Sequence, residues 1–160
     1  MKASLSFILI YAAFSLAGFL FPVDRPWYNS LAKPVWTPDG STIGIVWGVL
    51  YGLIAFSVTY AWMKNGFKQL GIIFWSIFLF NYLTNQLFSF FQFKLKDLLL
   101  AAFDTTLVAL SSLIMIVFLT KWEKVSGLLL IPYLLWSLFA TFLAFSIYLM
   151  NPGQTTLPWF

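Results

Sequence analysis

Four polar side chains recur at regular steps inside one long apolar stretch of the sequence. Asn81, Asn85, Ser89 and Gln92 follow one another at intervals of four, four and three residues. A helix over residues 70–92 would therefore place them on one face. Because burying an unpaired amide in an apolar medium is costly, this face must meet protein or a wet cavity rather than lipid. Two uses remain open, hydrogen bonds between helices and contacts with a ligand.

Asp104 is the acidic residue that lies well inside an apolar stretch. A carboxylate at membrane depth suggests a functional site by default. No Lys or Arg falls in the interior of the predicted helices to pair with it. We expect Asp104 to be protonated, bonded to the amides of residues 70–92, or close to cations of the first loop. A structural role and a functional role remain equally open.

Large rings stand beside small residues in the second apolar stretch. Trp47 and Tyr51 lie four residues apart and share one helical face, next to a stripe of glycines. Small-residue stripes allow membrane helices to approach closely, so bundle packing is their default meaning. Two rings beside a smooth groove also suit a flat aromatic ligand. The glycines are Gly44, Gly48 and Gly52.

The last apolar stretch repeats this arrangement. Trp136, Ala140 and Ala144 follow one another at steps of four, so one bulky ring is followed by small residues on the same face. Such a face is typical of a pocket wall. Pro132 stands near its start, where it is tolerated in the first turn of a helix or kinks a longer one.

The composition excludes most conventional chemistry. The chain has no His and no Cys, which removes the commonest general base, thiolate nucleophiles and the usual metal ligands. We therefore expect no metal site and no covalently attached cofactor. The net charge of +4 is too small and scattered for a nucleic-acid interface. Only 9% of the residues are charged and 61% are apolar, which predicts a membrane protein.

Five apolar stretches divide the chain, and each approaches the roughly 20 residues that a helix needs to cross a bilayer. They lack the alternation of barrel strands, so helices are expected. The sequence predicts an all-α membrane protein, a five-transmembrane-helix bundle. The expected helices cover residues 4–21, 43–63, 70–92, 98–120 and 127–150.

The loops between the predicted helices are short, apart from the first. We expect residues 1–151 to form a single transmembrane domain and residues 152–160 a short C-terminal tail. The first stretch is long for a cleaved signal peptide and is expected to be a retained helix. Residues 22–42, the lid loop, contain several rings and are stiffened by Pro26, Pro34 and Pro38. They form either an aromatic belt at the headgroups or a folded lid over a cavity.

Lys and Arg are distributed almost evenly between the two ends of the predicted bundle. The amino end and the second and fourth loops hold five, and the first and third loops hold four. This small excess favours a cytoplasmic amino end. The five are Lys2, Lys64, Lys68, Lys121 and Lys124, and the four are Arg25, Lys33, Lys94 and Lys96.

Several of these segments together resemble the TspO/translocator protein family, the tryptophan-rich sensory proteins also known as the peripheral-type benzodiazepine receptor family. The main motif is WYNSLAKPVWTP at residues 27–38, continued by VWGVLY at residues 46–51. Asn85 with the ring pair at 90–91 extends the resemblance, as do PYLLW at 132–136 and FAT at 139–141.

The resemblance implies a five-helix bundle, usually a homodimer in a lipid bilayer, with a ligand cavity below the first loop. Proteins of this family bind porphyrins, cholesterol and synthetic drugs of the benzodiazepine-receptor type. Bacterial members are linked to tetrapyrrole sensing or transport and to light-dependent porphyrin degradation. We therefore expect a multi-pass protein of the bacterial plasma membrane.

Carried onto this sequence, the resemblance implies a ligand site made of rings, one amide and small residues. Trp47 and Trp136 would also take the photochemical role if the protein degrades porphyrin under light. The expected function is a porphyrin-binding receptor or transporter; the alternatives are a light-dependent porphyrin-degrading enzyme and a structural scaffold. The expected ligand-binding residues are Tyr28, Trp36, Pro38, Trp47, Tyr51, Asn85, Phe88, Phe91, Asp104, Trp136 and Ala140.

Overall fold

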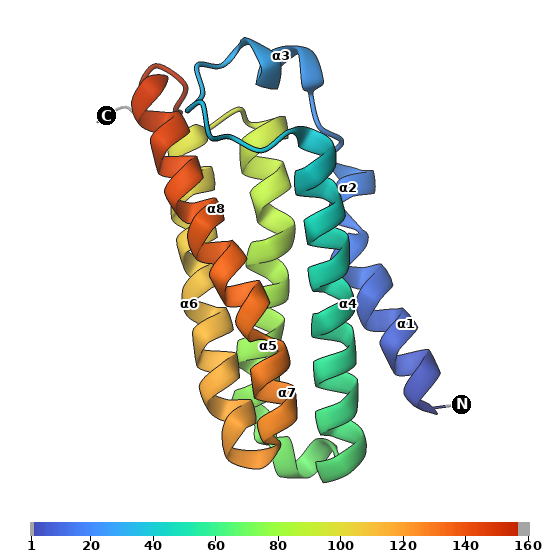
Figure 1. Ribbon diagram of the computed structural model, residues 1–160. Coiled ribbons are helices and arrows are strands. Elements are labelled where there is room, and N and C mark those ends of the chain that lie inside the picture. Colours follow the sequence, from blue (N-terminus) through green and yellow to red (C-terminus); the bar gives the residue numbers. More distant parts are fainter. Residues whose placement is uncertain (1, 157–160) are drawn as a thin grey trace.

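The computed structural model describes residues 2–156, and for Phe67 the backbone alone. Within that range the chain is built of helices joined by short connections, and no strand is present. The long helices run up and down side by side, and the lid loop crosses one end of the bundle (Figure 1). In chain order the helices are α1 (Lys2–Ser15), α2 (Ala17–Leu20), α3 (Arg25–Ser30), α4 (Gly40–Asn65), α5 (Phe67–Ser89), η1 (Phe90–Lys94), α6 (Leu98–Trp122), α7 (Lys124–Leu129) and α8 (Ile131–Met150).

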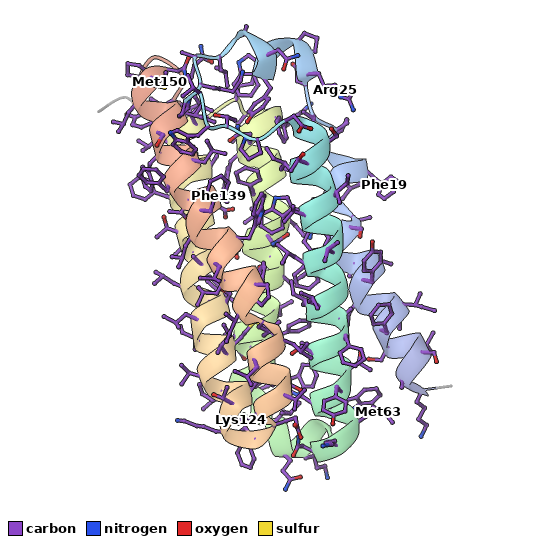
Figure 2. The ribbon with its side chains drawn as sticks, in the orientation of Figure 1. Phe19, Arg25, Met63, Lys124, Phe139 and Met150 are labelled. Carbon is purple, nitrogen blue, oxygen red and sulfur yellow. The ribbon has the colours of Figure 1, made fainter. Side chains whose placement is uncertain are left out.

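Five segments of the described chain are long and apolar enough to cross a membrane, which confirms the predicted all-α, five-transmembrane-helix fold. Their outward side chains are apolar, and Phe19, 83% exposed, points away from the bundle (Figure 2). The spans are Lys2–Leu20, Gly40–Asn65, Lys68–Lys94, Leu98–Trp122 and Lys124–Met150.

Three of the spans are interrupted in ways that the apolar pattern did not predict. The first divides into α1 and α2 around Leu16. The last divides into α7 and α8 at Leu130, which places Pro132 in the first turn of α8, where its missing N–H is tolerated. The third ends in the π-helical turn η1, which extends it beyond the expected residue 92 to Lys94.

Acidic side chains fix the starts of the helices. Asp24, Asp39, Asp97 and Glu123 are the N-caps of α3, α4, α6 and α7, and each accepts a hydrogen bond from a backbone N–H of the first turn. An N-cap of this kind stabilises a helix by about 1 kcal/mol. Four of the chain's five acidic residues are therefore used as caps, and Asp104 is the fifth.

The lid loop is folded onto the end of the bundle. Leu31 is buried against Leu98 at the start of α6 and against Leu143 and Ile147 of α8. Burying a leucine side chain contributes about 1.5–3 kcal/mol. A larger apolar cluster fills the rest of the bundle, from Phe14 down to the opposite end.

The glycine stripe of α4 does not mediate a close helix contact within the described chain. A Cβ at Gly44 would meet no atom within 4 Å, and one at Gly48 would lie 3.8 Å from the Tyr11 hydroxyl. The close approach occurs at Gly127 instead, where a Cβ would collide with Cγ2 of Thr120. Glycine at 127 allows α7 to pack directly on the end of α6.

Candidate functional site: a cavity beneath the lid loop

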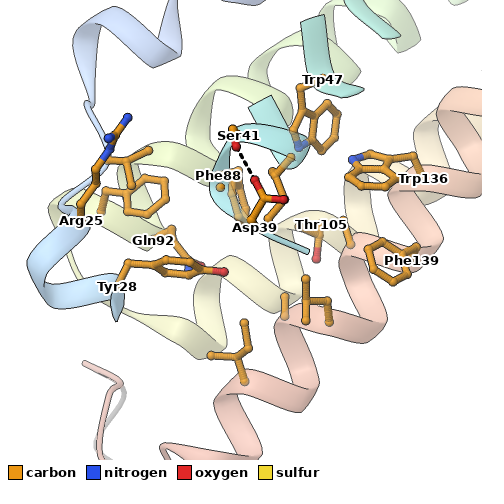
Figure 3. Close-up of a pocket in the computed structure, with 18 of the residues that line it drawn as sticks. Arg25, Tyr28, Asp39, Ser41, Trp47, Phe88, Gln92, Thr105, Trp136 and Phe139 are labelled. Carbon is orange, nitrogen blue, oxygen red and sulfur yellow. Dashed lines mark hydrogen bonds between the residues drawn. The ribbon is translucent and has the colours of Figure 1, made fainter. Parts of the chain in front are cut away.

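A cavity of about 450 Å³ lies beneath the lid loop, between α4, the end of α5, α6 and α8 (Figure 3). Its size falls in the range of small-molecule sites, which is about 300–1,000 Å³. Most of its wall is apolar and aromatic. The lining rings are Tyr28, Trp47, Phe88, Phe93, Trp136 and Phe139, and the lining polar residues are Arg25, Asn29, Asp39, Ser41, Gln92 and Thr105.

Two indoles project into this space from facing helices. Trp47 comes from α4 and Trp136 from α8, and Figure 3 shows both directed toward the cavity. The Trp136 ring packs against Phe139 with 5.1 Å between centroids, and Trp47 lies 5.7 Å from the Tyr51 ring. The Nε1 atom of Trp136 is buried and has no hydrogen-bond partner within residues 2–156. The walls therefore offer flat, polarisable surfaces to a flat guest.

The roof of the cavity is formed by Tyr28 of α3. Lys33 Nζ donates to the backbone oxygens of Tyr28 at 2.6 Å and of Leu31 at 3.1 Å, and it lies 4.8 Å from the centre of the Tyr28 ring. Burial raises the pKa of Tyr28 above its usual value, so its hydroxyl is protonated at neutral pH. The Lys33 ammonium therefore stabilises the lid loop through these contacts.

Polar contacts hold the roof to the neighbouring segments of the chain. Asp24 forms a 2.9 Å ion pair with Lys96 in the turn before α6, and Lys96 also lies 5.5 Å from the centre of the Trp27 ring. The indole N–H of Trp27 donates to Gln154 Oε1 at 3.3 Å. The hydrogen bond from Lys96 holds the pKa of Asp24 below its usual value.

The end of α8 and the C-terminal tail also make polar contacts with the lid-loop end of the bundle. The Asn151 amide accepts from Ala32 N at 3.0 Å and donates to Ala32 O at 2.8 Å. Thr156 N donates to the carboxylate of Asp97 at 2.6 Å. The expected tail, residues 152–160, is therefore in part a structural element, and its last four residues lie outside the described range.

The two charged residues that line the cavity differ in whether they have partners within the protein. The Asp39 carboxylate accepts hydrogen bonds from Ser41 and Thr42, which hold its pKa well below the usual range. Arg25 has no carboxylate within ion-pair distance in the described part of the chain. Arg25 is therefore free to meet an acidic group on a guest.

Five of the eleven residues expected at the site line the cavity, and six do not. Those that line it are Tyr28, Trp47, Phe88, Trp136 and Ala140.

The others lie around the cavity rather than on its wall. Trp36, 43% exposed, stacks on Phe142 at 5.4 Å on α8. Phe91 packs beside Phe90, and Pro38 stands just before the N-cap of α4. Asp104 is only 3% exposed, and its Oδ2 atom has no hydrogen-bond partner among the described residues.

Tyr51 and Asn85 belong to a hydrogen-bonded network between helices. Tyr51 OH donates to Asn85 Oδ1 at 2.9 Å, and Asn85 Nδ2 donates to Tyr133 OH at 3.1 Å. Tyr133 OH donates in turn to Asn81 Oδ1 at 3.1 Å, and Asn81 Nδ2 donates to Ser111 Oγ at 2.8 Å. The polar stripe of α5 and η1 is divided in the structure: Asn81 and Asn85 join helices, whereas Gln92 lines the cavity.

Several lining residues did not appear among the expected site residues. The α8 wall is completed, at helical spacing from Trp136, by Phe139, Leu143, Ala144 and Ile147. The helical face of Trp136 and the small residues after it could therefore have predicted them from the sequence. Thr105 lines the cavity although its neighbour Asp104 was the expected residue. A single residue step turns a helix by about 100°, and only the packing of α6 decides which of the two faces inward.

The fold and the site together define a class: a multi-pass helical membrane protein with an aromatic cavity of ligand size at one end. Residues 6–149 match the TspO/MBR family profile. The chain belongs to the TspO/MBR family.

Similar proteins extend over nearly the whole chain. It is 52% identical over 145 residues to the tryptophan-rich protein TspO of Bacillus cereus, which covers 91% of this chain and 94% of that protein. It is 48% identical over 145 residues to the membrane protein YtaB of Bacillus subtilis, covering 91% and 93%. Protein CrtK of Rhodobacter capsulatus is 31% identical over 153 residues, covering 92% and 94%. The chain is an integral, multi-pass membrane protein of bacterial type.

Proposed function

We propose that the protein binds a metal-free tetrapyrrole of the porphyrin type in the cavity beneath the lid loop. The observation that carries this proposal is a 450 Å³ cavity walled by the indoles of Trp47 and Trp136 and roofed by Tyr28. Flat conjugated rings stack favourably on such walls, each aromatic pair adding about 0.5–1.5 kcal/mol beyond the buried area. The protein acts in the membrane as a receptor or transporter of this ligand, and the same cavity accepts drugs of the benzodiazepine-receptor type.

The residue types favour a ligand without a metal. The commonest axial ligands of haem are His and Cys, and the chain has neither; the weaker candidates are Met and Tyr, and Tyr28 lines the cavity. None of the residues that line the cavity is Met. The walls therefore hold the macrocycle by stacking. The proposal also includes a homodimer in a bacterial plasma membrane, with one cavity in each subunit.

The test is a titration of the detergent-solubilised protein with protoporphyrin in the dark, followed by quenching of tryptophan fluorescence. We expect saturable binding in the wild type and an affinity at least about tenfold lower in Trp136→Ala, since one stacking surface and its buried area are lost. Trp122→Ala is the matched control, because Trp122 is exposed at the far end of the bundle. Quenching that does not saturate would instead support a structural scaffold.

A second function, light-dependent degradation of porphyrin, is favoured by one observation: Trp47 and Trp136 both line the same cavity. The excited macrocycle and dioxygen would supply the reactivity, as cofactors generally do, and the protein would orient the macrocycle beside the two indoles. No conventional nucleophile and base are needed.

Illumination of the same porphyrin complex tests this second function. We expect a defined product in light and none in darkness, and Trp136→Phe should reduce the rate because phenylalanine is a poorer electron donor than indole. Chromatography of the extracted pigment measures the product. An unchanged product in a variant that lacks both Trp47 and Trp136 would remove the indoles from the reaction.

A further inference from the structure

Gln92 is a buried amide that lacks a partner in the protein. It lines the cavity, and the residue is only 4% exposed. No hydrogen bond joins its side-chain amide to another residue within the described range. The buried amides of Asn81 and Asn85 on the same segment are both paired. The Gln92 amide faces the cavity, so its hydrogen-bond partner comes from a molecule inside the cavity.

The Gln92 amide lies in a local distortion of the backbone. Gln92 lies in the π-helical turn η1, which is closed by the hydrogen bond from Leu95 N to Phe90 O at 2.9 Å. Such a turn contains one residue more than an α-helical turn, and π turns occur frequently at functional sites. Gln92 follows the lining residue Phe88 by four positions, so both lie on one face of the segment, and the π turn ends the segment there.

The cavity also offers hydrogen-bond donors to a guest, and the carboxylate on its wall, Asp39, is already bonded to Ser41 and Thr42. The Tyr28 hydroxyl makes no hydrogen bond within residues 2–156, and Figure 3 shows it directed into the cavity. Arg25 is the cation among the described lining residues and has no carboxylate partner there. Hydrogen bonds from such donors to an ionised acceptor are stronger than neutral ones.

We propose that the Gln92 amide hydrogen-bonds a carboxylate of the bound ligand, so that the cavity selects flat conjugated acids over alkyl macrocycles of the same shape. This inference rests on the proposed function and adds a specificity residue to it. Gln92 anchors the acidic edge of the ligand beneath the lid loop, and the indoles of α4 and α8 hold its apolar rings.

The experiment compares two metal-free porphyrins in the dark: protoporphyrin, which carries two carboxylates, and etioporphyrin, which carries only alkyl groups. We expect wild-type protein to prefer protoporphyrin. Gln92→Met keeps the length of the side chain and removes its polar atoms, and it should weaken protoporphyrin binding by about tenfold or more. Its affinity for etioporphyrin should stay the same or rise. Gln92→Glu places a carboxylate opposite the carboxylate of the ligand. Because like charges repel, it should weaken protoporphyrin binding at least as much.

Gln86→Met is the matched control on the same helix. Gln86 donates to Phe14 O at 3.2 Å and does not line the cavity, so its loss should not change the ratio of the two affinities. Equal effects of Gln92→Met on both porphyrins, or no effect on either, would overturn the inference while the proposed function stands. Saturable binding of neither porphyrin by the wild type would overturn both.

Discussion

Tyr133 shows how a single hydroxyl organises the polar interior of the bundle. The residue is fully buried, and its hydroxyl donates to Asn81 and accepts from Asn85. It also packs edge-on against Trp47, with 6.2 Å between ring centroids. Tyr133 thus connects the amides of α5 to the wall of the cavity, and the network keeps polar side chains at membrane depth paired.

Replacing Tyr133 by Phe should destabilise the protein. The change leaves Asn81 Oδ1 and Asn85 Nδ2 without their partner in a buried site, which costs about 1–3 kcal/mol. Thermal unfolding in detergent would measure the effect. Tyr82→Phe provides the comparison, since the Tyr82 hydroxyl makes no hydrogen bond within the described chain. If the two variants unfold at the same temperature, the network does not stabilise the bundle.

At the scale of elements, the lid loop is a folded unit that its neighbours hold in place. Helix α3 begins at its Asp24 cap, and the same carboxylate pairs with Lys96 before α6. Asn151 at the end of α8 pairs with both backbone groups of Ala32. The roof of the cavity therefore depends on three segments that are distant in sequence.

The ion pair between Asp24 and Lys96 makes the lid loop sensitive to acid. Lys96 lowers the pKa of Asp24 from its usual 3.8, so the stabilisation is complete above that value and is lost as the pH falls through the lowered pKa. We expect Lys96→Met to reduce amide-exchange protection of α3 several-fold at pH 7. In the wild type, protection should fall toward the level of the variant below about pH 4.

Hydrogen exchange followed by mass spectrometry, expressed as protection factors, measures this change. Lys94→Met is the control, because Lys94 is exposed nearby and forms no ion pair in the described part of the chain. Asp39 also has a lowered pKa, but it is unchanged in both variants. Equal protection of α3 in Lys96→Met and the wild type at pH 7 would show that the ion pair does not hold the roof.

Considered as a whole, the molecule has its aromatic cavity at the lid-loop end and a large apolar cluster that extends toward the opposite end. The cavity lies between the cluster around Leu31 and the larger cluster that includes Phe74, Met115 and Leu119. At the end opposite the lid loop, Lys64 pairs with Glu123 at 3.2 Å. The Lys and Arg excess of five to four still predicts that this end faces the cytoplasm and that the lid loop lies on the other side.

The sequence alone was sufficient for the five spans, the all-α class and the family. Apolar length is a local property, and a bilayer of fixed thickness converts it directly into helices. The lining residues Trp47, Trp136 and Ala140 were also predictable, since ring and small-residue spacing on one helix marks a face.

Only the tertiary structure decided which polar residue serves which purpose. Asn85 and Gln92 belong to one stripe, yet Asn85 finds Tyr51 and Tyr133 on other helices, whereas Gln92 is left facing the cavity. A hydrogen-bond partner from another helix is not encoded in local spacing. The break at Leu130 and the π turn at the end of α5 interrupt regular helices, so a face inferred from regular spacing cannot be extended across them.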